Sequence, residues 1–225
     1  MKPDTAGTAG YGANASALAQ QYESIQFEEV HHQVLHLFPS QPCRVLDIGA
    51  GSGRDAAALA RKGHTVIAVE PTAAFRDEGQ RRHRLPNLAW LDDHLPALPA
   101  TRQSQQRFDV ILLTAVWMHL EADERQIGMQ NLADLLRPGG NIFMTLRHGP
   151  VPEGRKMFDV STQETIALGE KFGLQKKHVS ERRDMFDRGD IRWSHVVLEK
   201  NEASAADHSL HASSAKRGRF GNDNE

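Results

Sequence analysis

Hydrophobic residues in this chain gather in short uninterrupted runs, and these runs alternate with amphipathic stretches. The clearest runs are Val45-Leu46, Val66-Ile67-Ala68-Val69 and Val110-Ile111-Leu112-Leu113. A run without polar alternation is typical of a strand that is buried on both faces of a sheet. We therefore expect these three segments to be central strands of a parallel sheet that carries helices on both faces.

The pattern between residues 44 and 147 predicts alternating strands and helices. The predicted strands are 44–48, 65–69, 88–91, 108–113 and 141–147, and the predicted helices are 54–62, 72–83 and 121–136. The segment 95–106 contains Pro96 and Pro99, so we expect the helix before the fourth strand to be short or absent. This alternation places the chain in the α/β class.

The pattern changes on either side of that region. Residues 17–37 are predicted to form one N-terminal helix, which Pro39 ends. Ser161 and Glu164 form a capping box, which predicts that a helix begins there and ends before Gly173. The last strand pair is predicted at 174–180 and 191–200.

The two ends of the chain have the composition of tails. Residues 1–14 are rich in Gly, Ala and Thr and are predicted to be flexible. Residues 201–225 are predicted to be disordered, because Leu210 and Phe220 are their only large apolar residues. The prediction is one domain over 15–200, with a cofactor half at 44–147 and a substrate-side half at 148–200.

Length and charge limit the classes of function. The chain has 225 residues, 27 of them basic and 29 acidic, so its net charge of -2 gives no general support for a nucleic-acid partner and does not exclude one.

Cys43 is the only cysteine, which excludes an intramolecular disulfide and fits a reducing compartment. With no leader pattern and no apolar run of membrane-spanning length, we expect a soluble, cytoplasmic protein with no membrane partner. The oligomeric state is not predicted.

The first predicted strand ends in three glycines at alternate positions, Gly49, Gly51 and Gly53, and a helix follows directly. This strand, turn and helix start are typical of a site for a nucleotide-like ligand. A dinucleotide fingerprint needs its last glycine three positions after the second, where this chain has Arg54, so pyrophosphate binding is the weaker interpretation. Glycine lets the backbone approach a ligand closely, and the helix-start amides with Asp47 nearby suit a zwitterionic amino acid.

The segment from Val45 to Gly53 resembles motif I of the class I S-adenosylmethionine-dependent methyltransferases, in which the turn contacts the amino-acid part of the cofactor. The segment Arg137-Pro138-Gly139-Gly140 resembles the turn before the fifth strand of that family. The resemblance extends from about Tyr22 to Lys200. It implies a Rossmann-like, doubly wound, seven-stranded sheet, mostly parallel with an antiparallel last strand. It also implies S-adenosyl-L-methionine as cofactor and S-adenosyl-L-homocysteine as product.

Acidic residues follow the second and the third predicted strands. Glu70 ends the second strand, where a carboxylate can accept hydrogen bonds from both hydroxyls of a ribose, although an NAD site would use the same position. Asp92 and Asp93 follow the third strand and resemble the acidic segment that reads the adenine amino group in this family. Because side chains alternate along a strand, only one should face the ligand, and the sequence does not decide which. The predicted cofactor-binding residues are Asp47, Gly49, Ala50, Gly51, Gly53, Glu70, Pro71, Asp92 and Asp93, with no metal ligands.

The substrate side carries two candidate groups. His119, after the fourth strand, is the candidate general base, because an unperturbed imidazole takes up a proton near neutrality. Arg147, after the fifth strand, could anchor a carboxylate or phosphate of a small substrate, or it could form an ion pair with an acidic neighbour. Further arginines could extend an anion site: Arg155, Arg182, Arg183 and Arg192.

Several missing features reduce the list of acceptors. Thr114-Ala115-Val116 stands where enzymes acting on base exocyclic amines have an Asn-Pro-Pro or Asp-Pro-Pro turn, and Cys43 is on the wrong side of its strand for cytosine C5 chemistry. No acidic pair of the protein-arginine type and no evident cluster for a divalent metal follow the fourth strand. We therefore predict in-line methyl transfer to an O, N or S atom of a small molecule.

Three alternatives stay open at this point. An RNA or protein methyltransferase would use the basic tail and the arginines near the last strand pair. A module of this fold could bind cofactor or a partner without catalysis. A nicotinamide-dependent reductase conflicts with the glycine spacing and lacks a Tyr and Lys pair, since Tyr11 and Tyr22 both precede the sheet.

Overall fold

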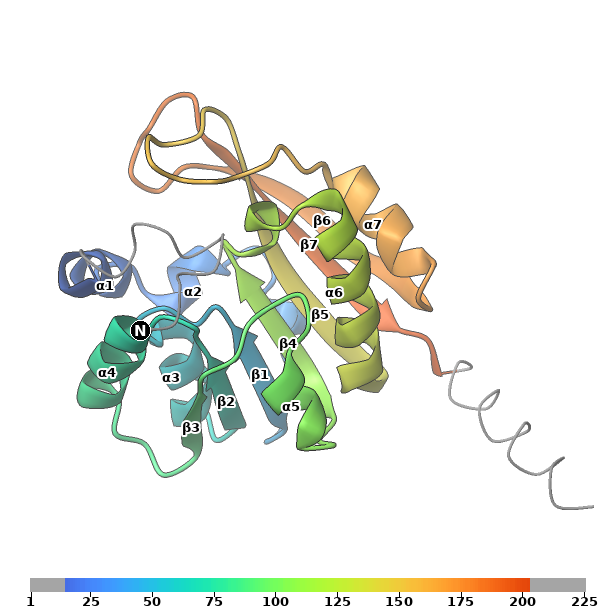
Figure 1. Ribbon diagram of the computed structural model, residues 1–225, viewed down its shortest axis with the longest axis horizontal. Helices are drawn as coiled ribbons and strands as arrows, with labels where there is room; N and C mark the ends of the chain where they lie inside the picture. The colour runs from blue at the N-terminus through green and yellow to red at the C-terminus, as the bar shows by residue number, and fades with distance from the viewer. Residues whose placement is uncertain (1–14, 203–225) are drawn as a thin grey trace, which may run out of the picture.

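The computed structural model describes residues 15–202, which form a seven-stranded sheet in the order β3-β2-β1-β4-β5-β7-β6 (Figure 1). Strands β1 to β5 are parallel, whereas β7 is antiparallel to both of its neighbours, β5 and β6. This topology confirms the predicted Rossmann-like α/β fold. The strands are β1 (Arg44–Ile48), β2 (Thr65–Val69), β3 (Leu88–Leu91), β4 (Phe108–Thr114), β5 (Leu136–His148), β6 (Leu174–Arg183) and β7 (Arg192–Lys200).

The helices follow the predicted alternation, and several start at identifiable caps. Ser161 accepts a hydrogen bond from the Glu164 backbone N at 3.0 Å, as its capping box predicts. The short helix between β3 and β4 is a single element of five residues, as the prolines of that segment predict. The helices are α3 (Arg54–Arg61), α4 (Ala73–Arg82), α5 (Pro99–Gln103), the 3-10 turn η3 (Trp117–His119), α6 (Ala122–Leu135) and α7 (Thr162–Glu170).

The sheet separates two apolar layers, and the central strands contribute to both. Val110 and Leu112 of β4 pack in one layer, while Ile111 and Leu113 pack in the other, and all four are fully buried. This is the alternation expected of a strand with both faces covered. The prediction that the uninterrupted apolar runs are central strands is therefore confirmed for β1, β2 and β4.

The N-terminal region differs from the sequence prediction. One helix over 17–37 is wrong: the chain forms α1 (Ala15–Glu23), α2 (Phe27–Val30) and the 3-10 turn η2 (Leu35–Leu37). At the break, the Gln26 backbone is extended and its N–H donates to the Glu29 carboxylate at 2.7 Å. The break lets Ala19 pack beside α4 and Phe27 pack in the core layer over β1 and β4, two surfaces that one straight helix would not reach.

Strand boundaries also differ at the ends of the sheet. Strand β5 begins at Leu136, not at residue 141, because Leu136 pairs with Phe108 before a bulge leads into the regular ladder. Strand β6 extends to Arg183, which pairs with Arg192 of β7. The predictions for residues 1–14 and 203–225 lie outside the described residues. Within 15–202, no helix combines the length and the apolar character needed to cross a membrane.

Candidate functional site

A cavity of about 610 Å³ lies at the carboxyl edge of the parallel strands. The loops after β1, β2 and β3 line one part, and the loop after β4, the end of β5, the loops that follow it and the β6–β7 connection line another. These last segments project beyond the edge of the sheet in Figure 1. Open α/β sheets bind ligands at this edge, because the loops that leave the strands converge there.

The turn after β1 is held close to the neighbouring strands. The backbone N–H groups of Gly49 and Ala50 donate to the Val69 carbonyl at 2.8 and 3.0 Å. Gly49 and Gly51 have positive φ angles of 68° and 56°, a region that favours glycine. A Cβ on Gly49 would come within 2.5 Å of Val116, so this turn also needs glycine for space. Gly49, Ala50 and Gly51 all line the cavity.

Gly53 has a different place from the other two glycines. It is the N-cap of α3 with φ 87°, and a Cβ there would come within 2.7 Å of the Trp90 ring. Neither Gly53 nor Trp90 is among the cavity-lining residues. The structure thus explains the third glycine by the packing of Trp90 beneath the turn.

Asp47 presents an unpaired oxygen in this part of the site. Its side chain is buried and lines the cavity, and it accepts a hydrogen bond from the Ala56 backbone. Its Oδ2 atom has no hydrogen-bond partner among the described residues. Burial, followed by the nearby charge of Asp55, raises the pKa of Asp47 well above its usual value. A buried oxygen of this kind fits a ligand that brings a cation or a hydrogen-bond donor.

Glu70 joins the glycine turn to the start of α4. Its Oε2 accepts from the Gly51 N–H and its Oε1 accepts from the Thr72 N–H, both at 2.9 Å. Burial raises its pKa, and these backbone donors oppose that effect. Each carboxylate oxygen can accept two hydrogen bonds, so the group retains capacity for two hydroxyls. Glu70 and Pro71 both line the cavity, where the sequence predicts them.

The structure distinguishes the two acidic residues after β3. Asp93 is buried, and its Oδ2 accepts from the Thr101 N–H at 2.7 Å and from the Thr101 hydroxyl at 2.8 Å, while its Oδ1 accepts from the His94 N–H at 3.0 Å. Asp93 lines the cavity, but its carboxylate is satisfied by its own loop. Asp92 does not line the cavity; its half-exposed carboxylate lies 3.2 Å from the Arg76 guanidinium.

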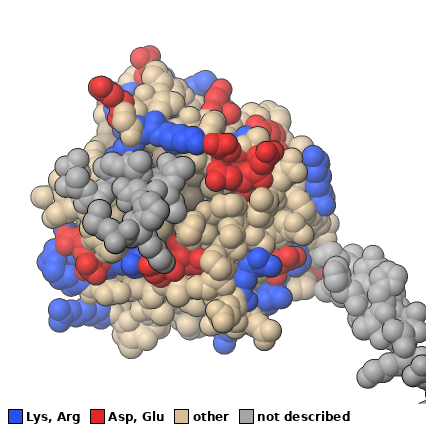
Figure 2. All heavy atoms as spheres, in the orientation of Figure 1, with Lys and Arg blue, Asp and Glu red and all other residues tan. Residues whose placement is uncertain are grey.

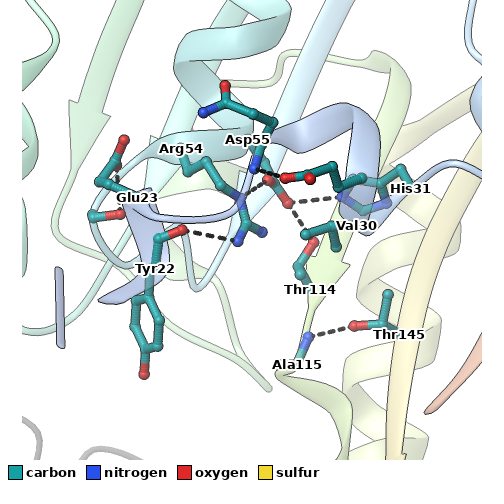
Figure 3. Close-up of polar contacts among 12 residues, drawn as sticks. Tyr22, Glu23, Val30, His31, Arg54, Asp55, Thr114, Ala115 and Thr145 are labelled. Carbon is teal, nitrogen blue, oxygen red and sulfur yellow. Dashed lines mark hydrogen bonds and ion pairs between the residues drawn. The ribbon is translucent and has the colours of Figure 1, made fainter. Parts of the chain in front are cut away.

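A buried polar network behind the glycine turn was not predicted from the sequence. Asp55 accepts from the Arg54 Nε at 2.6 Å and from the Thr114 hydroxyl at 2.7 Å, and lies 2.9 Å from the His31 Nε2 (Figure 3). Burial alone would raise the pKa of Asp55, but Arg54 and His31 outweigh burial and hold the pKa well below its usual range. Arg54 also donates to the Tyr22 carbonyl at 3.3 Å. The network connects α2, α3, β4 and the end of α1, and its sequence signal is a charged pair directly after the glycines.

His119 lies at the cavity edge in η3. Its Nδ1 is 2.8 Å from the Lys156 carbonyl, which can only accept, so Nδ1 donates and the lone pair of the neutral ring is on Nε2. Burial lowers the pKa of His119, and the Lys156 carbonyl partly opposes this, so the ring is neutral at physiological pH. The loop before η3 is positioned by the Thr145 hydroxyl, which accepts from the Ala115 N–H at 2.8 Å (Figure 3).

Arg147 is buried at the end of β5 and lines the cavity. Its guanidinium donates to the Gly149 carbonyl at 3.3 Å and to the Pro150 carbonyl at 2.7 Å. It forms no ion pair within residues 15–202, so the alternative of a structural ion pair is not observed there. Of the further arginines, Arg155 and Arg182 line the cavity, and the exposed Arg183 and Arg192 do not.

Comparison with known proteins is consistent with this geometry. The family model of the methyltransferase domain matches residues 45–140, which run from β1 to the turn within β5. An uncharacterized methyltransferase of Oceanobacillus iheyensis is 25% identical over 73% of this chain and 71% of its own length. Residues 45–140 thus match the methyltransferase domain, and the fold is shared with solved S-adenosylmethionine-dependent methyltransferases. Two solved methyltransferases of this fold contain S-adenosylhomocysteine.

Solved methyltransferase structures share the fold. A TehB-like S-adenosylmethionine-dependent methyltransferase from Corynebacterium glutamicum superposes with a TM-score of 0.64 at 21% identity, over 84% of this chain and 99% of that one. The 1,6-didemethyltoxoflavin-N1-methyltransferase of Burkholderia thailandensis, solved with 1,6-didemethyltoxoflavin and S-adenosylhomocysteine, gives 0.62 at 19% identity, over 88% and 94%. The chain spans less than half the length of several other curated relatives, such as 39% of an arsenite methyltransferase from Aquipseudomonas alcaligenes.

Proposed function

We propose that this methyltransferase transfers a methyl group from S-adenosylmethionine to an oxygen, nitrogen or sulfur atom of a small molecule by in-line displacement. The observation that carries the proposal is one cavity with two chemically different parts. The glycine turn, Asp47 and Glu70 line one part, and His119 and Arg147 line the other. A shared cavity suits a reaction whose protein component is mainly alignment of two reactants and exclusion of water.

The residues present suit the parts of the cofactor. The partnerless oxygen of Asp47 would accept from the amino group of the methionine moiety, and the backbone of Gly49 to Gly51 would approach it closely. Glu70 would accept from the ribose hydroxyls. For the adenine amino group neither acidic residue is fully suited: Asp93 lines the cavity but its carboxylate is satisfied by its own loop, and Asp92 lies against Arg76 and does not line the cavity. When bound, S-adenosylmethionine supplies an electrophilic methyl group on a sulfonium, which makes the sulfur a neutral leaving group.

His119 and Arg147 would act on the acceptor. A hydroxyl or protonated amine must lose a proton as its lone pair bonds to the methyl carbon, and Nε2 of a neutral His119 can take that proton. Arg147 would hold an anionic group of the acceptor through the guanidinium N–H groups that are not bonded to the Gly149 and Pro150 carbonyls. His119 is thus the proposed general base, and Arg147 the proposed substrate anchor.

The charge distribution favours a small acceptor over RNA. Figure 2 shows basic and acidic side chains interspersed over one face of the molecule, without an extended basic surface on the part that is visible there. The 1,6-didemethyltoxoflavin that is bound in the methyltransferase of Burkholderia thailandensis is a small molecule as well. An RNA or protein acceptor stays the alternative, and its binding would weaken steeply as salt is added.

Calorimetric titration with S-adenosylmethionine, S-adenosylhomocysteine and NADPH tests the proposal at the cofactor part. We expect the first two ligands to bind and NADPH not to bind. Glu70→Gln should weaken the binding of both adenosyl ligands by about tenfold or more, because the glutamine side chain has one acceptor oxygen where the carboxylate has two. The matched control is Glu170→Gln, an exposed change on α7 that should leave both affinities unaltered.

The results of these titrations distinguish the proposed function from a partner-binding module. Binding of neither adenosyl ligand would contradict the proposal and favour a partner-binding module of the same fold. Binding that Glu70→Gln and Glu170→Gln weaken equally would show that Glu70 has no special role at the ligand. Once binding is established, a loss of turnover in His119→Gln without a loss of S-adenosylhomocysteine affinity would support its role as base.

A further inference from the structure

Three side chains on the last strands form one row across the sheet. Trp193 of β7 pairs with Arg147 of β5 on one side and with Arg182 of β6 on the other. Residues directly opposite one another on paired strands point to the same face of the sheet. The row therefore presents Arg–Trp–Arg on one face, and all three residues line the cavity.

The spacing of the row follows from the sheet. Adjacent strands are about 4.8 Å apart, so the two arginines start roughly 10 Å apart with the tryptophan between them. The Arg182 guanidinium carbon lies 5.3 Å from the centre of the Trp193 ring, within the range of a cation–π contact. Long side chains from the outer strands can converge on one ligand group over this ring.

The positive charge of the row is not neutralised locally. Within residues 15–202, neither Arg147 nor Arg182 forms an ion pair, and the buried Nε of Arg182 has no hydrogen-bond partner. Among the described residues, Arg182 donates only to the Arg183 carbonyl, at 3.1 Å. A buried donor without a partner is costly, and an anionic ligand would supply the missing acceptor.

The acidic residue whose charge acts on both arginines is Asp184, and its carboxylate already has other partners. Asp184 accepts from the Arg188 guanidinium at 2.8 and 2.7 Å, from the Trp193 Nε1 at 2.8 Å and from the Phe186 N–H at 3.0 Å. These contacts neutralise Arg188 and fix the indole ring, so Asp184 has little capacity left for a second guanidinium. Burial, and then the charge of Arg188, lower the pKa of Arg147, and the charge of Asp184 partly opposes them.

We propose that the methyl acceptor is an anion, whose carboxylate or phosphate binds between Arg147 and Arg182 and whose apolar body packs on Trp193 and Met157. Both guanidinium groups have donors suited to planar oxyanions. The proposal rests on the proposed function, because it assigns the acceptor class of the same cavity. It goes further by naming Arg182 and Trp193 as specificity-determining residues.

Calorimetry on protein saturated with S-adenosylhomocysteine tests this assignment. The probes are benzoate, hexanoate and phenyl phosphate, each compared with a neutral partner of similar shape: benzamide, hexanamide and benzyl alcohol. We expect at least one anion to bind at least tenfold more tightly than its neutral partner, which is the scale of a charge-assisted hydrogen bond. Preference between benzoate and phenyl phosphate then distinguishes carboxylate from phosphate.

Neighbouring arginines of one strand provide the variants. Arg182→Gln should weaken binding of the anion about tenfold or more, and Arg182→Lys should restore part of it because the charge is kept. Arg183→Gln is the matched control, since Arg183 is exposed, lies on the opposite face of β6 and does not line the cavity. All three variants should bind S-adenosylhomocysteine like the unchanged protein, which also checks that they are folded.

Two results would overturn the assignment while leaving the proposed function intact. One is normal S-adenosylhomocysteine binding with no anion preferred over its neutral partner. The other is an equal effect of Arg182→Gln and Arg183→Gln on anion binding. Failure of S-adenosylhomocysteine to bind at all would instead count against the proposed function.

Discussion

Two neighbouring carboxylates, Asp47 and Asp55, illustrate how the surroundings of a residue decide its chemistry. Both are buried at the glycine turn. Asp55 has Arg54 and His31 as partners and stays ionised, whereas Asp47 has an unpaired oxygen beside the charge of Asp55, and its pKa is raised. The free site thus contains one carboxylate whose pKa is raised and would fall when a cation arrives.

This difference predicts that ligand binding releases protons. A cation bound at Asp47 lowers its raised pKa, so S-adenosylhomocysteine should bind more tightly as pH rises, until Asp47 is ionised in the free protein as well. Titrations at one pH in buffers of different ionisation enthalpy measure the proton release directly. Asp47→Asn should abolish it. An enthalpy that is independent of buffer in the unchanged protein would show that Asp47 does not meet a cation.

The residue scale also shows where sequence prediction stops. The sequence predicts Asp92 and Asp93 equally, because strand periodicity says only that one of them faces the ligand. The distinction comes from Thr101, eight positions after Asp93, whose N–H and hydroxyl satisfy the Asp93 carboxylate. That contact depends on how the loop folds back, which no local pattern encodes.

Helices and strands were predictable from the sequence where all of their residues lie in the same kind of environment. The central strands are apolar at every position because helices cover both of their faces, so their bounds follow closely from the sequence. The N-terminal helix failed because its apolar positions serve different surfaces. Leu18, Tyr22 and Ile25 line the cavity, whereas Phe27 and Val34 pack in the core. Helical periodicity alone does not reveal such a division.

The contact between α2 and β7 predicts a dependence of stability on pH. His195 lies with its Nε2 3.0 Å from the carbonyl of Val30, the last residue of α2. Burial, and then the charge of His31, lower the pKa of His195 to about 3. The unfolded chain takes up a proton near pH 6.5 and the folded chain does not, so stability falls as pH drops below 6.5. The loss between pH 7 and pH 5 should be about 2 kcal/mol from this group.

Denaturant unfolding at pH 7 and pH 5 checks this expectation. In His195→Gln, the difference in unfolding free energy between the two pH values should shrink by that amount, although the variant is less stable at pH 7. His36→Gln, an exposed change on η2, serves as the control and should leave the difference unaltered. An unchanged difference in His195→Gln would mean that His195 is not held neutral by the fold.

At the scale of the whole molecule, the cavity depends on segments from nearly every part of the described chain. Its lining runs from Leu18 in α1 to Trp193 in β7. The cofactor part of this arrangement was predictable, because its motif is contiguous with strands that the pattern identifies. In the acceptor part, the sequence named Arg147 and Arg182 as candidates, but not their arrangement with Trp193, since the three become neighbours only through the pairing of β5, β7 and β6.

Such a cavity should couple ligand binding to global stability. A ligand that binds only the folded state at 100 times its dissociation constant adds about 2.7 kcal/mol. For a chain of this size, S-adenosylhomocysteine should then raise the melting temperature by roughly 5 to 10 °C. Thermal unfolding with and without the ligand measures this shift, with NADPH at equal concentration as the control. An equal shift with NADPH would indicate non-specific stabilisation.

The antiparallel pair at the end of the sheet has a consequence for how such proteins diverge. The family match ends at residue 140, whereas Arg147, Arg182 and Trp193 all follow it. The proposed donor-binding residues and the proposed anion-binding residues are thus encoded in consecutive stretches of the gene, and of the proposed acceptor residues only His119 lies in the first stretch. If two relatives exchanged the stretch from the end of β5 through β7, each enzyme would acquire the acceptor preference of the other. The donor site would stay intact. New acceptors could be acquired by recombination at one junction.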